Sequence, residues 1–240
     1  MYHGKMVSVI LPTYREKNSI RGVIEEFFAT GFVDEVLVVH HSAEPGTEEE
    51  VKKTKARIIH GPKQHFGYSA QTGMLAARGD YIIICEPDAT YTARDLEKLL
   101  VFGKDLPVVF GTRTSRFTIL SGAAMGYWRK WANVLEAKVI EVLFNTTTLS
   151  DVGCNYRLLR REAVERVKSQ WREGGAIFTL EMMLLVVREG IPFVEIPVTY
   201  RPRVGESTGT AHWYQLVKWA FLFLFFIFGS WFRWLKKKSV

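Results

Sequence analysis

Two carboxylates separated by one residue are the feature of the sequence best suited to chemistry. They lie in the segment Glu86-Pro87-Asp88, directly after an apolar, β-branched run at residues 81–85 that is typical of a fully buried strand. Residues i and i+2 of an extended segment point the same way, so both side chains should project from the carboxyl end of that strand. Paired carboxylate oxygens at this end of an α/β sheet suit Mg²⁺ or Mn²⁺ shared with substrate phosphates. Alternatively, Asp88 caps a helix that begins near Thr92 and Glu86 is simply solvated.

Alternating strands and helices in the first half of the chain would hold these carboxylates in place. Apolar, β-branched runs predict strands at residues 6–11, 34–41, 56–60, 81–85 and 107–110. Helical spacing predicts helices at residues 19–30, 66–78 and 96–101. The second half is less regular, with helices predicted at 126–143 and 179–189 and a strand at 191–199. This order predicts an α/β domain with a mostly parallel sheet.

Composition and charge narrow the class of protein. The chain has 240 residues, of which 48% are hydrophobic and 24% charged, so it is long and apolar enough for one large α/β domain or two small ones and is not disordered. Its net charge of +7 is compatible with nucleic acid, anionic lipid or phosphorylated substrates, but no nucleic-acid-binding motif is present. The two cysteines, Cys85 and Cys154, suggest a reducing compartment. Because a strand pattern and no signal-peptide pattern occupies the start of the sequence, we expect the domain to face the cytoplasm.

The C-terminal segment has a different composition from the rest of the chain. Residues 219–232 carry no charge and are apolar on every helical face. These residues would span only ~21 Å as a helix, but residues 213–234 approach the ~30 Å of a bilayer core. Aromatic residues at both ends, among them Trp213 and Trp234, are typical of membrane interfaces. We therefore expect membrane attachment, by a spanning helix or by an interfacial one. A buried helix or a contact between copies in a homo-oligomer remains an alternative.

Six segments in order carry a family resemblance: VSVILPTYREKNSI, DEVLVVHHS, HFGYSAQTGMLAARGDYIIICEPD, GTR, DVGCNYRLLRREA and EIPVTYRPRVGES. Together they resemble the inverting glycosyltransferases of family 2, which have a GT-A fold, and in particular the polyprenyl-phosphate glycosyltransferases such as the dolichol-phosphate mannose synthases. The resemblance covers about residues 6–207. It implies a Rossmann-like, mostly parallel GT-A domain at residues 1–207, a linker at 208–212, a membrane helix at 213–235 and a basic tail at 236–240.

The resemblance also implies roles for individual residues. Glu86 and Asp88 match the metal-binding Asp-x-Asp of the family, with Mg²⁺ or Mn²⁺ as the expected ion. The residues implied in nucleotide-sugar binding are Pro12, Tyr14, Glu16, His40, Glu86, Asp88 and Arg203. The residues implied in catalysis are Asp88, Asp151 and Arg113. Arg113 and Arg129 match basic positions near the phosphates, and we expect them to contact the acceptor phosphate.

Two departures from the family pattern concern the donor site. His40 and His41 stand where the family usually has two aspartates, one of which contacts the base, so the sequence leaves open whether the donor is a GDP-sugar or a UDP-sugar. Adjacent histidines on a strand point to opposite faces, which disfavours a metal site made by this pair. Glu86 replaces the first aspartate of the metal motif, and its longer side chain predicts a different metal geometry.

The expected activity is metal-assisted transfer of a sugar, with inversion, from a nucleotide-sugar to a polyprenyl phosphate such as dolichyl or undecaprenyl phosphate. The acceptor phosphate is already ionised at pH 7, so no strong general base is required. Two alternatives stay open, namely a membrane-associated glycosyltransferase with a non-lipid acceptor and a catalytically silent nucleotide-sugar-binding subunit. A nucleotidyltransferase is disfavoured because no Gly-rich, Lys-containing loop follows the first strand, and a processive polysaccharide synthase because the chain has no Gln-x-x-Arg-Trp segment.

Overall fold

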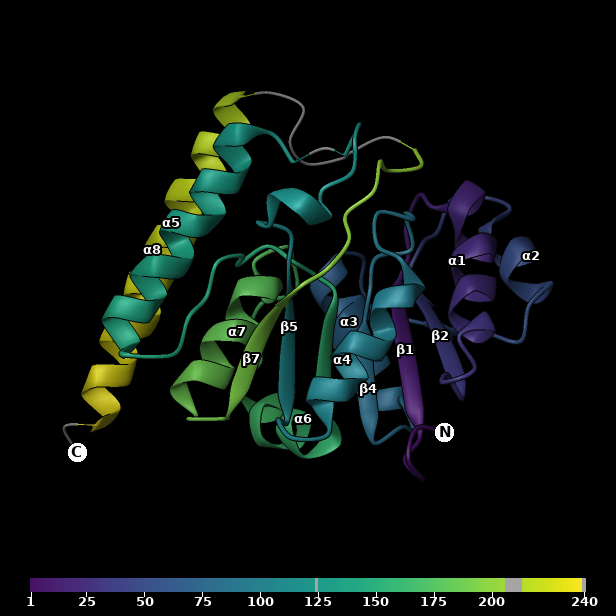
Figure 1. Ribbon diagram of the computed structural model, residues 1–240, viewed down its shortest axis with the longest axis horizontal. Helices are drawn as coiled ribbons and strands as arrows, with labels where there is room; N and C mark the ends of the chain where they lie inside the picture. The colour runs from purple at the N-terminus through teal and green to yellow at the C-terminus, as the bar shows by residue number, and fades with distance from the viewer. Residues whose placement is uncertain (124, 206–212, 239–240) are drawn as a thin grey trace.

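A seven-stranded sheet with the order β3-β2-β1-β4-β6-β5-β7 forms the centre of the protein (Figure 1). The structure is a computed structural model that describes residues 1–123, 125–205 and 213–238. The strands are β1 (Val7–Pro12), β2 (Glu35–His40), β3 (Arg57–His60), β4 (Tyr81–Ile84), β5 (Val108–Thr112), β6 (Arg157–Arg160) and β7 (Phe193–Pro197). Only β6 runs antiparallel to its neighbours in this sheet, β4 and β5. The expectation of a mostly parallel α/β sheet is confirmed.

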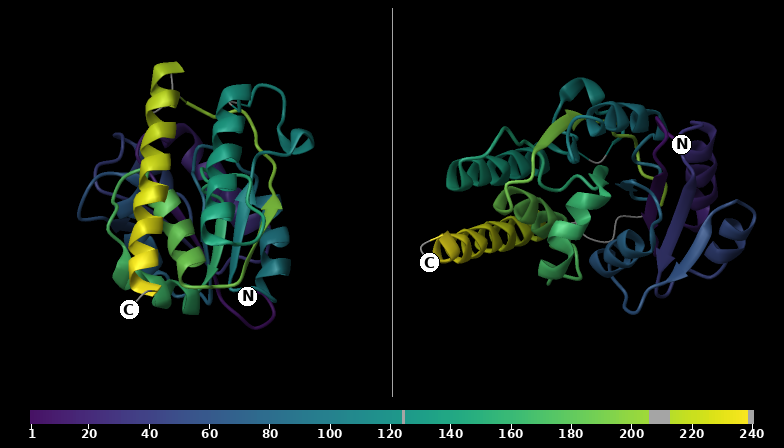
Figure 2. Two further views of the ribbon diagram at one scale, coloured as in Figure 1. Left: turned by 90° about the vertical axis from the view of Figure 1, so that its left-hand side faces the viewer. Right: turned by 90° about the horizontal axis from the view of Figure 1, so that it is seen from below.

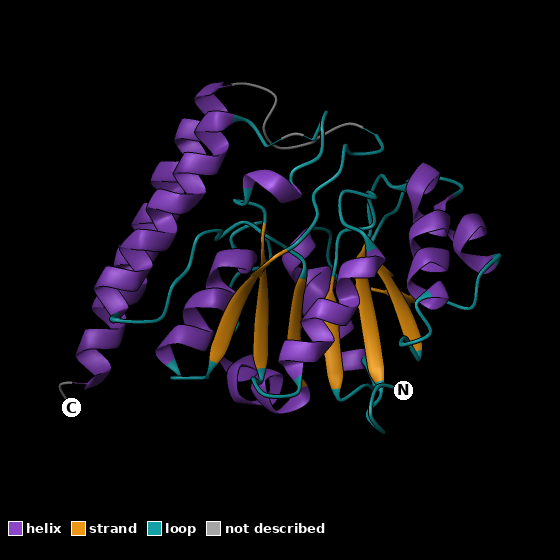
Figure 3. Cartoon of the chain, viewed as in Figure 1, coloured by secondary structure: helices purple, strands orange, loops and turns teal. Residues whose placement is uncertain are grey.

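Helices cover both faces of the sheet (Figure 3). They are α1 (Lys17–Ala29), α2 (Thr47–Lys52), α3 (Phe66–Ala76), α4 (Leu96–Gly103), α5 (Tyr127–Phe144), α6 (Arg161–Val167), α7 (Phe178–Arg188) and α8 (Trp213–Lys238), with 3₁₀ turns η1 (Ala93–Asp95), η2 (Arg116–Thr118) and η3 (Lys168–Gln170). Alternate residues of each central strand enter different cores, as the pleat requires. Ile82 and Ile84 of β4 pack with α3 and α7, whereas Ile83 packs with α1 and α4.

Helix α2 was not predicted from the sequence. Its residues follow Pro45 and Gly46, between the strands predicted at 34–41 and 56–60, where no helix was predicted. The helix is only six residues long, and only Thr47 and Val51 are buried, so it has too few apolar positions to produce a periodic pattern. Gly46 lies in the left-handed region with φ of 91°, which glycine adopts without strain and which lets the chain turn directly into the helix.

A fully buried arginine connects the sheet to α7. Arg157 has 0% of its surface exposed, and its guanidinium donates to the carbonyl oxygens of Cys154 (2.6 Å), Thr179 (2.5 Å) and Val152 (3.0 Å). It also lies 5.0 Å from the centre of the Phe110 ring. Burial lowers its pKa to about 10, which still leaves the group charged at neutral pH. Arg157 therefore fixes the loop before β6 against the first turn of α7.

Replacing Arg157 with methionine should lower the free energy of unfolding by about 3 kcal/mol or more, because three buried carbonyls lose their donor. The measurement is a urea titration of the variant and the wild-type protein. Arg166→Met is the matched control, since Arg166 is an exposed arginine of α6 with one hydrogen bond to the carbonyl of Glu189. Equal losses in both variants would contradict a structural role for Arg157.

Helices α5 and α8 lie side by side at one end of the molecule (Figure 2). Both begin on the side of the sheet where the parallel strands end (Figure 1). One side of α8 packs on the domain, where Ile227 and Ser230 are buried, whereas Phe221 and Phe225 are 71% and 78% exposed. In the described part of the chain, one helical segment, Val217–Lys236, is long and apolar enough to cross a membrane.

The contacts of α8 bear on the expectation for the C-terminal segment. Membrane attachment was expected and a buried helix was the alternative; in the structure one side of α8 contacts α5 and α7 and the other side is exposed. The helix also extends to Lys238, into residues expected to form a basic tail. The proposed linker at residues 208–212 lies outside the described residues.

Candidate active site

The carboxyl ends of β1, β2 and β4 meet around a cavity of about 430 Å³. It is lined by Pro12, Thr13, Tyr14, Arg15, Glu16, His41, Ser42, Gln64, His65, Phe66, Ser69, Glu86, Pro87, Ala176 and Arg203. The cavity therefore brings together five residues that the sequence assigned to nucleotide-sugar binding, namely Pro12, Tyr14, Glu16, Glu86 and Arg203. Its volume is in the usual range for small-molecule sites, about 300–1,000 Å³.

The two carboxylates of the Glu86-Pro87-Asp88 segment are each held by hydrogen bonds. Asp88 is 1% exposed, and its Oδ1 accepts from the backbone N–H (3.0 Å) and the hydroxyl (2.5 Å) of Thr90, while its Oδ2 forms an ion pair with Arg203. Oε1 of Glu86 accepts from Nδ2 of Asn155 at 3.0 Å. Burial, and then the charge of Asp88, raise the pKa of Glu86. Two carboxylates whose charges repel form a favourable environment for a cation.

The structure does not support the alternative in which Asp88 caps a helix. The turn η1 begins after Thr92, and the hydroxyl oxygen of Thr92 accepts from the N–H of Arg94 at 3.2 Å. Oδ1 of Asp88 instead bonds its own turn, two residues on, and Ala89 between them has a positive φ of 62°. This local hydrogen bonding fixes the orientation of Asp88 at the end of β4.

Glu16 shapes the loop after β1. Its Oε2 accepts from the backbone N–H groups of Tyr14 (2.6 Å) and Arg15 (2.8 Å). Burial raises its pKa more than these bonds lower it. The next helix, α1, is connected to the Glu86-Pro87-Asp88 segment, because the hydroxyl of Ser19 donates to the carbonyl of Pro87 at 2.7 Å. Glu16 therefore acts on the site through the loop conformation, in addition to lining the cavity.

Arg113 and Asp151 form a buried ion pair. Asp151 is 0% exposed, and it accepts from Nε (2.8 Å), Nη2 (2.8 Å) and the backbone N–H (2.9 Å) of Arg113. Burial raises the pKa of Asp151, but the charge and hydrogen bonds of Arg113 outweigh this effect and lower it. We expected Arg113 to contact the acceptor phosphate. In the structure, the Nε–Nη2 edge of its guanidinium is occupied by Asp151.

The other two predicted arginines lie in the same electrostatic environment as the carboxylates. Arg203, at the cavity, interacts with Asp88 and Glu86, and Arg129, on α5, interacts with Arg113, Arg203 and Glu86. Arg129 is partly buried, and this burial lowers its pKa, as do the charges of the other two arginines. The site therefore combines two carboxylates with three guanidinium groups, of which Arg113 is neutralised by Asp151.

His40 does not line the cavity, whereas its neighbour His41 does. His40 pairs with His60 on the adjacent strand, with ring centres 4.9 Å apart, and its Nε2 lies 3.3 Å from Glu48. One ligand atom from each of these three residues lies within 4.8 Å of the others, which is close enough for a metal. However, Nδ1 of His40 accepts the N–H of Ala43 at 3.2 Å, so the ring proton lies on Nε2 and leaves no lone pair there for a metal.

Asn155 is a site residue that sequence reasoning did not single out. It donates to Glu86 and accepts from the hydroxyl of Thr179 at 2.6 Å, and its backbone N–H donates to the hydroxyl of Tyr91 at 3.3 Å. It lies 69 residues after Glu86 in the chain. Its position in the segment DVGCNYRLLRREA was the available signal, but the contact follows from the pairing of β4 with β6.

Comparisons with known proteins agree with this geometry. The family model for "Glycosyl transferase family 2" matches residues 8–168. A low-salt glycan biosynthesis hexosyltransferase, Agl6 of Haloferax volcanii, is 29% identical over 207 residues, which cover 84% of this chain and 49% of that protein. A dolichyl-phosphate hexose transferase of the same organism is 25% identical over 204 residues, which cover 84% of this chain and 85% of that protein. The chain thus spans about half of the first relative and most of the second.

Solved structures match the fold. The glucosyl-3-phosphoglycerate synthase of Mycobacterium tuberculosis, in complex with Mn²⁺, UDP-glucose and phosphoglyceric acid, superposes with a TM-score of 0.72 at 14% identity. The match covers 94% of this chain and 80% of that one. Another complex of the same synthase, with Mn²⁺, UDP and phosphoglyceric acid, gives a TM-score of 0.67 at 15% identity and covers 85% of this chain and 72% of that one. At this identity the likeness establishes the fold.

Proposed function

Because this chain belongs to glycosyl transferase family 2 and has the GT-A fold, we propose that it transfers a hexose from a nucleotide-sugar donor to a polyprenyl phosphate. The observation that carries the proposal is the cavity in which Glu86 and Arg203, with Asp88 directly behind them, face the loop from Pro12 to Glu16. The similarity to a dolichyl-phosphate hexose transferase and the apolar helix α8 support a lipid acceptor. Binding of UDP-glucose and Mn²⁺ by the glucosyl-3-phosphoglycerate synthase supports a UDP-sugar donor.

The donor would occupy the cavity with its base between the loop after β1 and the end of β2. Pro12, Tyr14 and His41 line that part, and Tyr14 is 38% exposed, so its ring is accessible for stacking. His41 replaces His40 in this proposal because it is the histidine that lines the cavity. Its Nδ1 donates to the carbonyl of Gly61 at 3.0 Å, which fixes the ring and leaves Nε2 as an acceptor.

Glu86 and Asp88 fit a divalent cation. Each has one oxygen held by a hydrogen bond, and Asp88 is buried beside Arg203. Such oxygens suit Mg²⁺ or Mn²⁺, which when bound would neutralise charge on the diphosphate leaving group. Asp88 would then bind the metal, and its ion pair with Arg203 would weaken. Arg203 would become available for a phosphate oxygen.

The acceptor needs orientation more than activation. A lipid monophosphate is ionised at neutral pH, so a strong base is not required, and attack on the anomeric carbon from the side opposite the diphosphate inverts its configuration. Arg129 and Arg203 supply positive charge for the acceptor and the donor, and the Arg113–Asp151 pair holds the loop beside them. We expect the exposed side of α8 to keep the enzyme at the bilayer that holds the acceptor. The buried free thiols of Cys85 and Cys154 support a cytoplasmic location for the domain.

Removing Asn155 should shift the pH dependence of the site. Asn155→Ala takes away the hydrogen bond to Glu86, whose pKa is already raised by burial and by Asp88. The pKa of Glu86 then rises further, so the carboxylate that binds metal is protonated at a higher pH. Mn²⁺-dependent donor binding should weaken about tenfold at the acid end of the profile and recover toward alkaline pH. Asn18→Ala, an exposed change on α1, is the control. An unchanged profile would contradict this role of Asn155.

The proposed function is tested with membranes that contain the protein, a panel of radiolabelled UDP- and GDP-hexoses, and polyprenyl phosphate. We expect label from one donor to enter the organic phase, in a reaction that EDTA stops. Label in a water-soluble glycan or protein would favour the alternative with a non-lipid acceptor. Nucleotide-sugar binding without transfer to any acceptor would favour a silent binding subunit.

A further inference from the structure

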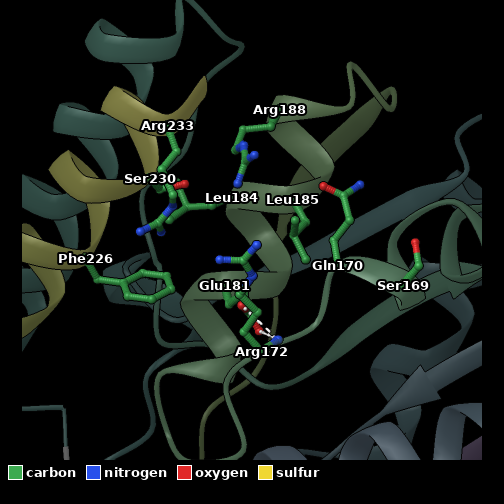
Figure 4. A pocket seen from close by; sticks show the side chains of 10 residues that line it. All are labelled: Ser169, Gln170, Arg172, Glu181, Leu184, Leu185, Arg188, Phe226, Ser230 and Arg233. Carbon is green, nitrogen blue, oxygen red and sulfur yellow. Dashed lines mark hydrogen bonds between the residues drawn. The ribbon is translucent and has the colours of Figure 1, made fainter. Parts of the chain in front are cut away.

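A second cavity lies at the seam between α7 and α8 (Figure 4). It has a volume of about 150 Å³ and is lined by Ser169, Gln170, Arg172, Glu181, Leu184, Leu185, Arg188, Phe226, Ser230 and Arg233. None of these residues lines the active-site cavity. Because the two cavities have no lining residue in common, they are separate sites.

Three arginines from different elements converge on this cavity. The guanidinium groups of Arg172, Arg188 and Arg233 point into the space in Figure 4. Among the described residues, none of the three has a carboxylate within 4.0 Å. One carboxylate lines the cavity, that of Glu181, and it accepts from the backbone N–H groups of Arg172 (3.1 Å) and Glu173 (3.0 Å). The cavity therefore has an excess of positive charge.

Arg188 is the most constrained of the three. Its Nε is buried and has no hydrogen-bond partner among the described residues. Burial lowers the pKa of Arg188, and the charges of Arg233 and Arg172 lower it further, whereas those of Glu189 and Glu181 raise it. An unpartnered donor and mutual repulsion both carry a cost in free energy, and an anion in the cavity would relieve both.

We propose that this cavity binds a phosphate group, with Arg172, Arg188 and Arg233 as charged contacts and the hydroxyl of Ser230 as a further donor. Planar guanidinium groups bind tetrahedral oxyanions through paired hydrogen bonds, and the volume corresponds to about five water molecules, which is sufficient for a phosphate. Ser230 is 2% exposed, so its hydroxyl is held inside the seam.

A phospholipid headgroup is one natural source of this phosphate. Arg233 and Ser230 lie on α8, whose exposed side carries Phe225, Phe228 and Phe232. Acyl chains against these rings would bring a headgroup to the seam, and basic groups at a membrane surface favour anionic lipids. A soluble phosphate is the other source of the same chemistry, and the two are separated by experiment.

The test compares Arg188→Gln/Arg233→Gln with Arg166→Gln/Lys218→Gln in the full-length protein. Both double variants lose two positive charges from α-helices, but Arg166 and Lys218 do not line the cavity. Vesicle flotation measures binding to phosphatidylcholine alone and to phosphatidylcholine mixed with phosphatidylglycerol, and calorimetry in detergent measures binding of inorganic phosphate. If the Arg188→Gln/Arg233→Gln protein does not fold, Arg172→Gln takes its place. Arg172 is exposed, so its replacement should not disturb folding.

If the bound phosphate belongs to a lipid headgroup, the cavity variant should lose about tenfold more of its phosphatidylglycerol-dependent vesicle binding than the control variant. Phosphate binding in detergent that only the cavity variant loses identifies a soluble phosphate. Equal losses in the two variants, together with no phosphate binding by the wild-type protein, would overturn the proposal. Transfer in detergent should be unchanged in the cavity variant, so this outcome is independent of the proposed activity.

Discussion

Asp88→Asn is expected to reduce kcat/KM for sugar transfer by about 10³-fold or more, equivalent to about 4 kcal/mol of transition-state stabilisation. Asparagine keeps the size of the side chain and an acceptor for Thr90 but removes the charge that pairs with Arg203. It also removes one of the two carboxylates that fit a divalent cation. Charge on the diphosphate leaving group would then develop without its main compensation.

The measurement is steady-state transfer by purified Asp88→Asn and Asp105→Asn proteins, with thermal unfolding as the check on folding. Asp105 is an exposed aspartate after α4, and its loss should leave transfer near the wild-type rate. Wild-type turnover in folded Asp88→Asn protein, or wild-type transfer that survives excess EDTA, would contradict the metal role.

Asp151→Ala is expected to lower the free energy of unfolding by about 3–5 kcal/mol, because it leaves the guanidinium of Arg113 buried without its partner. Arg113 is only 7% exposed, and Asp151 accepts three of its hydrogen bonds. Urea unfolding of Asp151→Ala and of Glu25→Ala gives the comparison. Glu25 belongs to an exposed pair with Arg21 on α1, so its loss should matter much less.

The same pair predicts a pH dependence. Arg113 lowers the folded-state pKa of Asp151 below its ordinary value of 3.8 in spite of burial. A group with a lowered folded-state pKa stabilises the protein above its unfolded pKa, and this stabilisation is lost as the pH falls through the folded value. The difference in unfolding free energy between wild type and Asp151→Ala should thus be constant near neutral pH and narrow below about pH 4. A difference that stays constant into acid would contradict the ion pair.

The position of Glu86 and Asp88 at the end of β4 was predictable because it depends on local sequence. The β-branched run at residues 81–84 specifies a buried strand, and the two carboxylates follow it directly. Strand alternation also predicted that the side chains of His40 and His41 point to opposite faces of the sheet. Which of them lines the cavity depended on the pairing of β2 with β3, which sets His40 against His60.

Contacts between distant parts of the chain were not predictable from spacing. Arg113 is a basic residue that follows β5, and its ion pair with Asp151, 38 residues later, could not be inferred from the spacing. The hydrogen bond of Asn155 to Glu86 likewise depends on β6 pairing with β4. For α8 the composition predicted a helix, but residues that are apolar on every face do not indicate which face packs on α5 and α7.

The most direct measurement of the central claim uses purified protein in detergent with the donor chosen by the panel, polyprenyl phosphate and Mn²⁺. Mass spectrometry follows the lipid, and chromatography follows the nucleotide. We predict that the lipid gains the mass of one hexose for each nucleoside diphosphate released, and that neither product forms with Asp88→Asn. Release of nucleoside diphosphate without a glycosylated lipid would contradict the account.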